Sequence, residues 1–164
     1  PDHIEGGTGK LLAKATASEQ AAISGKYLCH PQDVLYSKIR PALRKVVLTE
    51  EICLCSADMY AIAPGTDFER DYLFYFLLTD AFTAYAELAS MRVAMPKVNR
   101  EALGSFPLVK PPLDEQRAIV IFVRNALEKL DGMVASVNGS ITRLSEYRSA
   151  VITSAVTGQI EGLQ

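Results

Sequence analysis

Cysteine and histidine side chains are the first candidates for chemistry, because thiolates and imidazoles bind metals and act as nucleophiles. Besides Cys29, the sequence has a C-x-C pair, Cys53 and Cys55, in an apolar run, and its only histidines are His3 and His30. A zinc site needs more ligands at suitable spacing. We therefore interpret the pair as two small apolar side chains on one strand face. We predict no metal site, and the sparse, odd cysteine set indicates a reducing compartment.

Two glycine-containing segments are candidates for phosphate or cofactor binding. They read "GGTG" at residues 6–9 and "GTDF" at residues 65–68. Neither segment lies cleanly between a strand and a helix, which is where such loops bind phosphate. The sequence contains no GxxxxGK[ST] motif for ATP. It also has no paired carboxylates beside a lysine in a nuclease-like arrangement. We predict no catalytic residues and no cofactor.

Basic side chains offer a different chemistry, the binding of phosphate groups. Residues 26–49 carry five basic side chains against one acidic, and residues 91–110 carry four against one. Residues 50–90 between them carry one basic side chain against eight acidic ones. The formal net charge of −2 conceals this separation. If the fold brings the two basic segments together, one face of the domain is positive, which suits a nucleic-acid backbone.

Seven of these basic side chains are our candidate DNA contacts. Arginine can bind guanine with two hydrogen bonds, and lysine mostly contacts phosphate. For each single residue the alternative is a solvated surface charge, and Lys38 could instead be an ion-pair partner on its strand. Thr8 and Lys10 are further candidates. The seven are Lys38, Arg40, Arg44, Lys45, Arg92, Lys97 and Arg100.

Three segments with strand character come before a helical one. Residues 33–39 alternate apolar and polar side chains, which predicts a half-buried strand. Residues 45–50 and 52–64 are rich in Val, Ile and Tyr and predict two more strands. The apolar spacing of residues 68–90 predicts a helix capped by Asp67.

A short helical turn is plausible at residues 99–103. Strands followed by a packed helix predict an α+β domain over residues 1–110, with mixed or antiparallel strands. We expect this domain to be incomplete at its N-terminus, because no strand-like segment opens the sequence.

Residues 111–164 are predicted to form one long coiled-coil helix. Asp114 is a good N-cap and Gly158 a good residue to end the helix. The helix would then be about 65 Å long. Apolar side chains recur in alternating steps of four and three, as in a coiled coil, with Arg148 as one polar exception. The helix-pairing positions, called the seam below, are Val123, Leu127, Leu130, Val134, Val137, Ile141, Leu144 and Val151.

Such a seam needs a second helix to cover it, and residues 1–110 contain none of matching length. We therefore predict pairing with a helix from another domain or chain; the alternative is that the seam packs on its own domain. Gly132 and Gly139 lie seven residues apart on a face away from the seam. Each weakens the helix by about 1 kcal/mol relative to alanine. They are either tolerated defects or places where a second partner approaches closely.

Five blocks carry a family resemblance. In order they are "HIEGGTGKLL", "PQDVLYSKIRPALRKV", "CSADMYAIAP", "MPKVNREALGSFPLVKPPLDEQRAI" and "LSEYRSAVITSAVTGQI". Together they resemble the specificity (S) subunit of type I restriction–modification systems. The most specific part is the PPLxEQRAI junction followed by the long helix and the AVTG ending. The chain matches one half of such a subunit, a single target-recognition domain with its spacer helix.

The resemblance implies a function in DNA recognition without catalysis. In that family each recognition domain reads half of a split DNA sequence, and the helices pair antiparallel and set the distance between the halves. The complex methylates adenine, and a separate motor subunit cleaves DNA. The implied partners are double-stranded DNA, methyltransferase (M) subunits, and the second half of the S subunit or another copy of this chain. The implied location is the cytoplasm, since no segment has the length and apolarity of a membrane span.

Two other classes of protein remain as alternatives. A coiled-coil adaptor would use the long helix to bind proteins and would not bind DNA. A hydrolase or transferase with an unrecognised site would need a deep pocket with a perturbed titratable group in residues 1–110.

Overall fold

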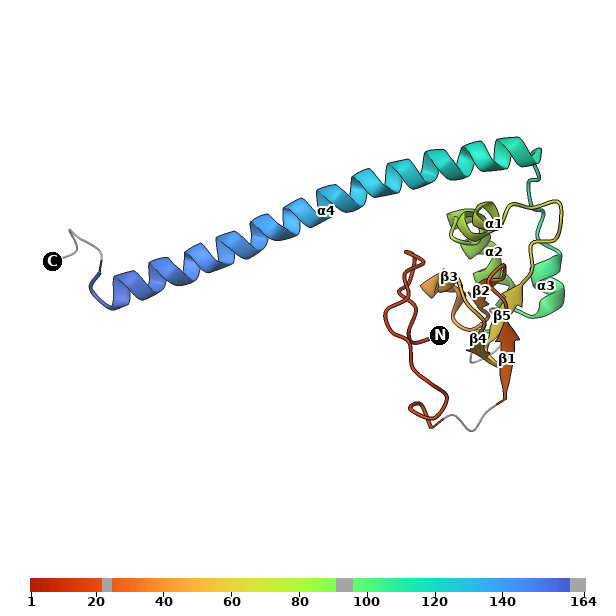
Figure 1. Ribbon diagram of the computed structural model, residues 1–164, viewed down its shortest axis with the longest axis horizontal. Helices are drawn as coiled ribbons and strands as arrows, with labels where there is room; N and C mark the ends of the chain where they lie inside the picture. Colours follow the sequence, from red (N-terminus) through yellow and green to blue (C-terminus); the bar gives the residue numbers. More distant parts are fainter. Residues whose placement is uncertain (22–24, 91–95, 160–164) are drawn as a thin grey trace. The chain divides into compact units, whose positions relative to one another are not determined.

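The computed structural model describes residues 1–21, 25–90 and 96–159 (Figure 1). The chain forms two compact units, residues 1–120 and residues 121–164. The predicted α+β class is confirmed: the first unit contains antiparallel sheets and short helices, and a long helix runs through the C-terminal part. Among the described residues, no helix combines the length and apolarity needed to cross a lipid bilayer.

A three-stranded antiparallel sheet forms the centre of the first unit. Its central strand β2 (Val34–Ser37) pairs with β3 (Val46–Leu48) on one side and with β5 (Met59–Ile62) on the other. The strands predicted around residues 33–39 and 45–50 are therefore confirmed. The prediction of a half-buried strand is wrong, because all four residues of β2 are buried.

Burial on both faces follows from the two hydrophobic clusters that the sheet separates. On one face, Val34, Tyr36 and Val46 pack against the helices and Val98. On the other face, Leu35 and Val47 pack with Met59. The second cluster consists of Ile4, Cys29, Leu35, Val47, Cys55 and Met59. The serine of β2 is also buried, and its hydroxyl donates to the carbonyl of Ile39 at 3.2 Å.

The first unit also contains a separate two-stranded sheet. Strand β1 (Lys26–Cys29), which we did not predict, pairs antiparallel with β4 (Cys53–Ser56). Residues 52–64 are thus two strands, β4 and β5, and not the single strand that we predicted. The chain turns between them where the Asp58 N–H donates to the Ser56 hydroxyl at 3.2 Å, a local bond that favours a turn.

The predicted helix over residues 68–90 is two helices, α1 (Arg70–Leu77) and α2 (Asp80–Ser90). The break follows from Thr79, whose hydroxyl oxygen accepts the N–H of Phe82 at 3.3 Å and so caps the second helix. The cap of α1 is Glu69 and not Asp67, because the Glu69 carboxylate accepts the N–H of Tyr72 at 2.9 Å.

The predicted helical turn near residue 100 is present as α3 (Arg100–Gly104), capped by the Asn99 side chain. The helices contribute an aromatic group to the first hydrophobic cluster. The rings of Phe82 and Phe106 meet edge to face with centroids 5.5 Å apart, and Tyr85 contacts Phe106 at 4.8 Å. Such contacts add to the stabilisation from burial alone.

The long helix α4 runs without a break over Leu113–Val156, 44 residues. At 1.5 Å per residue it is about 66 Å long. It begins one residue before the predicted cap: Asp114 lies in its first turn and bonds to Arg117 at 3.1 Å. Gly158 follows its end with φ of 72°, the left-handed conformation typical of a glycine there. The first eight residues of α4 belong to the first unit, where Gln116 and Val120 are buried.

Candidate nucleic-acid interface

The two basic segments of the sequence meet in the structure. Ile39 and Lys97 form an isolated antiparallel bridge. The Val98 N–H donates to the Lys38 carbonyl at 2.8 Å, and the Arg40 N–H donates to the Pro96 carbonyl at 3.0 Å. Backbone hydrogen bonds thus place the strand end after β2 beside the segment that leads into α3. The fold therefore brings the two basic segments together, which is what a positive face requires.

The ring of Tyr60 on β5 lies close to two of the cations. The Lys38 Nζ is 5.1 Å from the ring centroid, and the guanidinium carbon of Arg100 is 6.0 Å from it. Both distances are in the range of cation–π attraction. The Tyr60 hydroxyl donates to the Val98 carbonyl at 3.1 Å, which fixes the ring. We call Lys38, Arg40, Tyr60, Lys97 and Arg100 the basic patch.

One acidic side chain accompanies the basic patch. The Lys97 Nζ lies 2.9 Å from a carboxylate oxygen of Asp58, and both side chains are partly exposed. This hydrogen bond lowers the pKa of Asp58 below its ordinary value. The Lys97 charge is therefore partly neutralised, and a phosphate would have to compete with Asp58 for it. Lys38, which we considered as an ion-pair partner, is instead held over the Tyr60 ring.

Arg40 has an unusual backbone conformation. It precedes the 3-10 helix η1 (Pro41–Leu43), and Arg44 follows that helix. Both arginines have left-handed backbones, with φ of 49° and 46°. Residues other than glycine adopt this conformation at a cost and often do so at functional sites. The Arg40 side chain is exposed and has no bonding partner among the residues that the structure describes.

The other predicted DNA contacts are placed differently. Arg44 forms an ion pair with Asp80 at 2.6 Å, and the Lys45 Nζ donates to the Pro1 carbonyl at 2.9 Å. These two cations are thus engaged with other parts of the first unit. Arg92 lies outside the described residues. Thr8, a further candidate, donates its hydroxyl to the Glu5 carboxylate at 2.6 Å.

Tyr60 and Asp58 are the members of this site that sequence reasoning missed. Neither residue stands out in the sequence as part of a DNA-binding site. Asp58 is one of many acidic residues in its segment, and Tyr60 is typical of a strand. Asp58 lies in the turn between β4 and β5 and Tyr60 lies on β5, and no pattern in the sequence pointed to their contacts with the cations.

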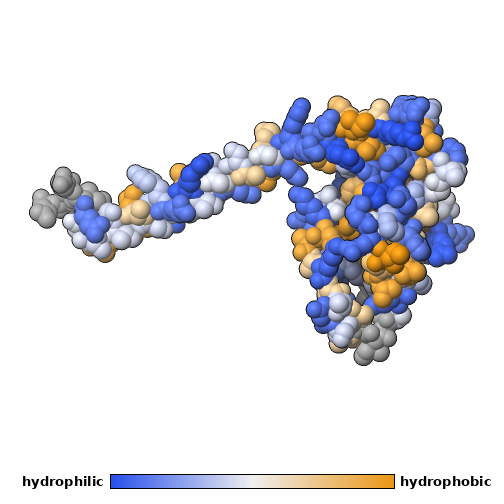
Figure 2. All heavy atoms as spheres, viewed as in Figure 1, coloured by the Kyte–Doolittle hydropathy of each residue, from blue (hydrophilic) through white to orange (hydrophobic). Residues whose placement is uncertain are grey.

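A second surface lies on α4. The named seam side chains from Leu127 to Val151 are 42–67 % exposed. Within residues 121–159 the structure describes only the rest of α4 and the turn after it, so this unit has no second element to cover the seam. Figure 2 shows hydrophobic residues, in orange, at intervals along the helix among hydrophilic ones. A Cβ atom added at Gly132 or Gly139 would meet no other atom within 4 Å.

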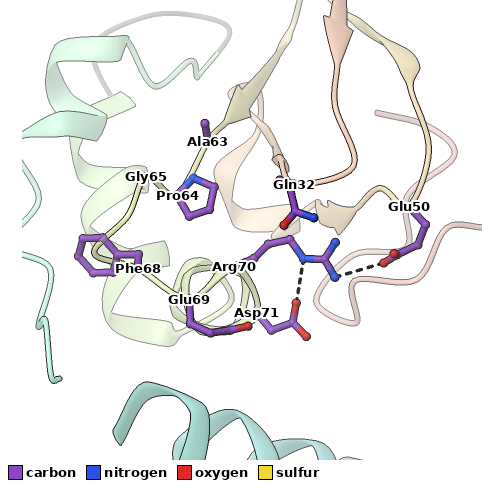
Figure 3. Close-up of a pocket in the computed structure, with 9 residues that line it drawn as sticks. All are labelled: Gln32, Glu50, Ala63, Pro64, Gly65, Phe68, Glu69, Arg70 and Asp71. Carbon is purple, nitrogen blue, oxygen red and sulfur yellow. Dashed lines mark hydrogen bonds and ion pairs between the residues drawn. The ribbon is translucent and has the colours of Figure 1, made fainter. Parts of the chain in front are cut away.

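Two surface pockets, of about 530 Å³ and about 540 Å³, are candidates for an enzyme site, and neither is lined by Cys29, Tyr36 or Tyr72. Figure 3 shows the first of them. Its central charge, Arg70, is fully engaged. The guanidinium contacts Glu50 at 3.3 Å and Asp71 at 3.1 Å, and donates to the Pro31 carbonyl at 2.8 Å. The lining residues are Gln32, Glu50, Ala63, Pro64, Gly65, Phe68, Glu69, Arg70 and Asp71.

Burial raises the pKa of three groups, Cys29, Tyr36 and Tyr72, and none of them lines this pocket. A raised pKa makes a thiol less reactive, because the thiolate is the nucleophile. Cys53 and Cys55 pack with the second hydrophobic cluster, as the apolar interpretation predicted. These placements do not favour the hydrolase or transferase alternative.

Comparison with known proteins adds to this geometry. Residues 9–141 match the family model described as "Type I restriction modification DNA specificity domain". The chain is 34 % identical over 160 residues to the type I restriction enzyme EcoDI specificity subunit of Escherichia coli. That match covers 98 % of this chain and 36 % of the relative, so the chain spans about a third of the relative's length.

Two solved structures share the fold. One is the HsdS subunit from Thermoanaerobacter tengcongensis, with a TM-score of 0.70 and 24 % identity. The match covers 80 % of this chain and 35 % of that one. The other comes from a study of complex assembly and conformational transition of the type I R-M system, with a TM-score of 0.67 and 21 % identity. It covers 80 % of this chain and 32 % of that one.

Proposed function

The chain belongs to the family of type I restriction modification DNA specificity domains, and from this we propose that it recognises double-stranded DNA as one half of a specificity subunit. In this proposal the intact subunit reads a bipartite site. It directs adenine methylation and restriction to that site and has no catalytic residues of its own. It acts in the cytoplasm, where the DNA is.

The basic patch is the proposed DNA surface. The observation that carries this proposal is the meeting of two basic segments at the Ile39–Lys97 bridge, since local charge excess attracts a phosphate backbone. Lys38 and Arg100 suit phosphate contacts, because each is held beside the Tyr60 ring. Arg40 suits a base contact, because it is exposed and extends from a constrained turn.

The seam of α4 is the proposed protein-binding surface. We propose residues 1–110 as the recognition domain and residues 111–164 as the spacer and pairing segment. In the intact subunit the seam would meet the helix of the other half, and in this chain alone it would form an antiparallel homodimer. The paired helices would also provide the docking surface for M subunits. The exposed apolar side chains from Leu127 to Val151 support this role.

DNA binding is tested by fluorescence anisotropy with duplex DNA at several salt concentrations. Lys38→Ala should weaken binding to all sequences alike and reduce the salt slope by about one. Arg40→Ala should in addition reduce the preference for one sequence over another. Arg117→Ala is the matched control, since this exposed arginine lies on α4 outside the basic patch. If the wild type bound DNA no better than a protein of equal charge, the DNA-recognition proposal would be wrong.

The sequence recognised by the intact system can be obtained by mapping methylated bases in cells that carry it. A bipartite motif containing methylated adenine is the expected result. The coiled-coil adaptor remains the second candidate, because the exposed seam suits it as well. It predicts that the chain dimerises but shows no salt-dependent binding to DNA.

A further inference from the structure

The side chain of Gln116 is completely buried at the start of α4, with 0 % exposure. Its amide nitrogen donates to the carbonyls of Asp67 at 3.0 Å and Pro111 at 2.8 Å. Its amide oxygen accepts the N–H of Glu69 at 2.8 Å. Both amide hydrogens are used, so the side chain has one favoured orientation. We call this set of three bonds the Gln116 clamp.

Neighbouring contacts strengthen the same connection. The Tyr72 hydroxyl donates to the Val109 carbonyl at 3.0 Å, and the Lys110 Nζ binds the Asp67 carboxylate at 2.9 Å. Val120, one turn after Gln116, is only 5 % exposed. Residues 109, 110 and 116 are thus bonded to the first turn of α1 and the residues just before it.

Gln116 lies at a seam position of the heptad repeat of α4. Gln116 precedes Val123 by seven residues, so it occupies a seam position of the same heptad pattern. Here the stripe faces its own domain, whereas from Leu127 onward it is exposed. A buried amide is costly unless all its hydrogen bonds are made, so it selects one packing arrangement where an apolar side chain would tolerate several.

We propose that Gln116 is a positioning residue that fixes the direction in which α4 starts from the recognition domain. Through the paired helices it would set the distance between half-sites that the protein accepts, a consequence that rests on the proposed function. From Gln116 to the end of α4 are forty residues, or about 60 Å of helix. A tilt of about 10° at the start would displace the far end by about 10 Å. One base pair is about 3.4 Å.

The first experiment measures the helix direction without DNA. Nitroxide labels are attached through non-natural amino acids at Ala84 on α2 and Glu146 on α4, two exposed positions. The labelled chain is diluted into unlabelled chain, and pulsed electron resonance gives the distance distribution. Gln116→Met should broaden it, because the side chain keeps its length and loses all three hydrogen bonds. Arg117 is the exposed neighbour of Gln116, so Arg117→Met is the control and should give a distance distribution as narrow as that of the wild type.

If Gln116→Met fails to fold, as judged by circular dichroism, Gln116→Glu takes its place. Its carboxyl group can still accept the Glu69 N–H and can donate to at most one of the two carbonyls, so we again expect broadening. A variant distribution as narrow as that of the wild type overturns the proposal. A wild-type distribution as broad as that of the variant overturns it too.

The second experiment measures spacing on duplex DNA selected by the wild-type chain from a randomised library. The probe is that duplex, with its central spacer kept or changed by one base pair. For each protein we take the ratio of its affinity for the duplex with the kept spacer to its affinity for the duplex with the changed spacer. This ratio should be on the order of tenfold lower for Gln116→Met than for the wild type, because binding both half-sites at once depends on geometry. Affinity for a single half-site should stay unchanged.

The two experiments separate the possible failures. An unchanged ratio overturns the role of Gln116 in spacing even if the distance distribution broadens. If the wild type selects no duplex, the proposed DNA recognition fails, and with it the spacing role. The distance measurement then decides alone whether Gln116 fixes the start of the helix.

Discussion

A single charge in the seam should break the pairing of α4. Leu130 is 54 % exposed in the single chain. Full burial of a leucine side chain stabilises by about 1.5–3 kcal/mol. Pairing can recover roughly half of this in each copy, or about 1.5–3 kcal/mol for the two copies in a dimer. Leu130→Asp removes this gain and adds the cost of desolvating two carboxylates.

The dissociation constant of the dimer should therefore rise by at least about tenfold, since about 1.4 kcal/mol is a factor of ten. Sedimentation equilibrium over a range of concentrations measures this constant directly. Circular dichroism checks that the variant keeps its helix content. Ser136→Asp is the matched control, because it adds the same charge at an exposed position of α4 outside the seam.

Two outcomes would refute the reasoning. One is a wild-type chain that stays monomeric at the highest concentration the centrifuge can measure. The other is a Leu130→Asp variant that dissociates at the same concentration as the wild type and Ser136→Asp. The first would mean that the exposed seam does not pair at all. The second would mean that pairing uses another face of the helix.

Four further predictions concern the first unit. Arg100→Ala should weaken DNA binding at all sequences and lower the salt slope by about one, measured by anisotropy titration. Tyr36→Phe should leave stability unchanged or raise it by up to about 1–3 kcal/mol in urea unfolding, because the Tyr36 hydroxyl is buried with no hydrogen-bond partner among the described residues. Tyr60→Phe, which loses a hydrogen bond, should instead lower stability by about 1 kcal/mol. The pKa of Asp58 is lowered in the fold by its hydrogen bond to Lys97, so its stabilising contribution is present above the ordinary pKa of 3.8 and lost as pH falls through the folded value. Asp58→Asn should therefore flatten the acid side of a plot of unfolding free energy against pH; an unchanged acid side would contradict this.

Local signals in the sequence were enough to predict several elements. The apolar run of β3 and the spacing of α4 come from residues close in the chain, so pattern alone located them. A helical turn was predicted at residues 99–103, and the structure has α3 there with Asn99 as its cap. The break between α1 and α2 was also a local event, but the apolar periodicity continues across it. Thr79 was the missed signal, because its side chain can cap a new helix.

Long-range contacts explain what the sequence could not predict. We interpreted residues 33–39 as alternating and half-buried, yet both faces of β2 are covered, one by helices and the other by the cluster around Met59. Charge counting identified seven candidate cations but not their partners. Arg44 pairs with Asp80, and Lys45 reaches the Pro1 carbonyl, forty-four residues away. Such pairings depend on the tertiary fold, which charge patterning does not contain.

The environment of Gln116 can be understood only from the heptad repeat and the tertiary structure together. The heptad pattern gives a face of α4 but not the partner of that face. From Val123 onward the heptad pattern predicts a seam that needs a partner helix. One heptad before Val123, the equivalent position is Gln116, whose buried amide makes three hydrogen bonds. The stripe packs on its own domain at Gln116 and Val120 and is exposed from Leu127 onward. Because α4 is unbroken through this point, one continuous helix carries both the hydrogen bonds of Gln116 to the first unit and the exposed seam that we propose for pairing.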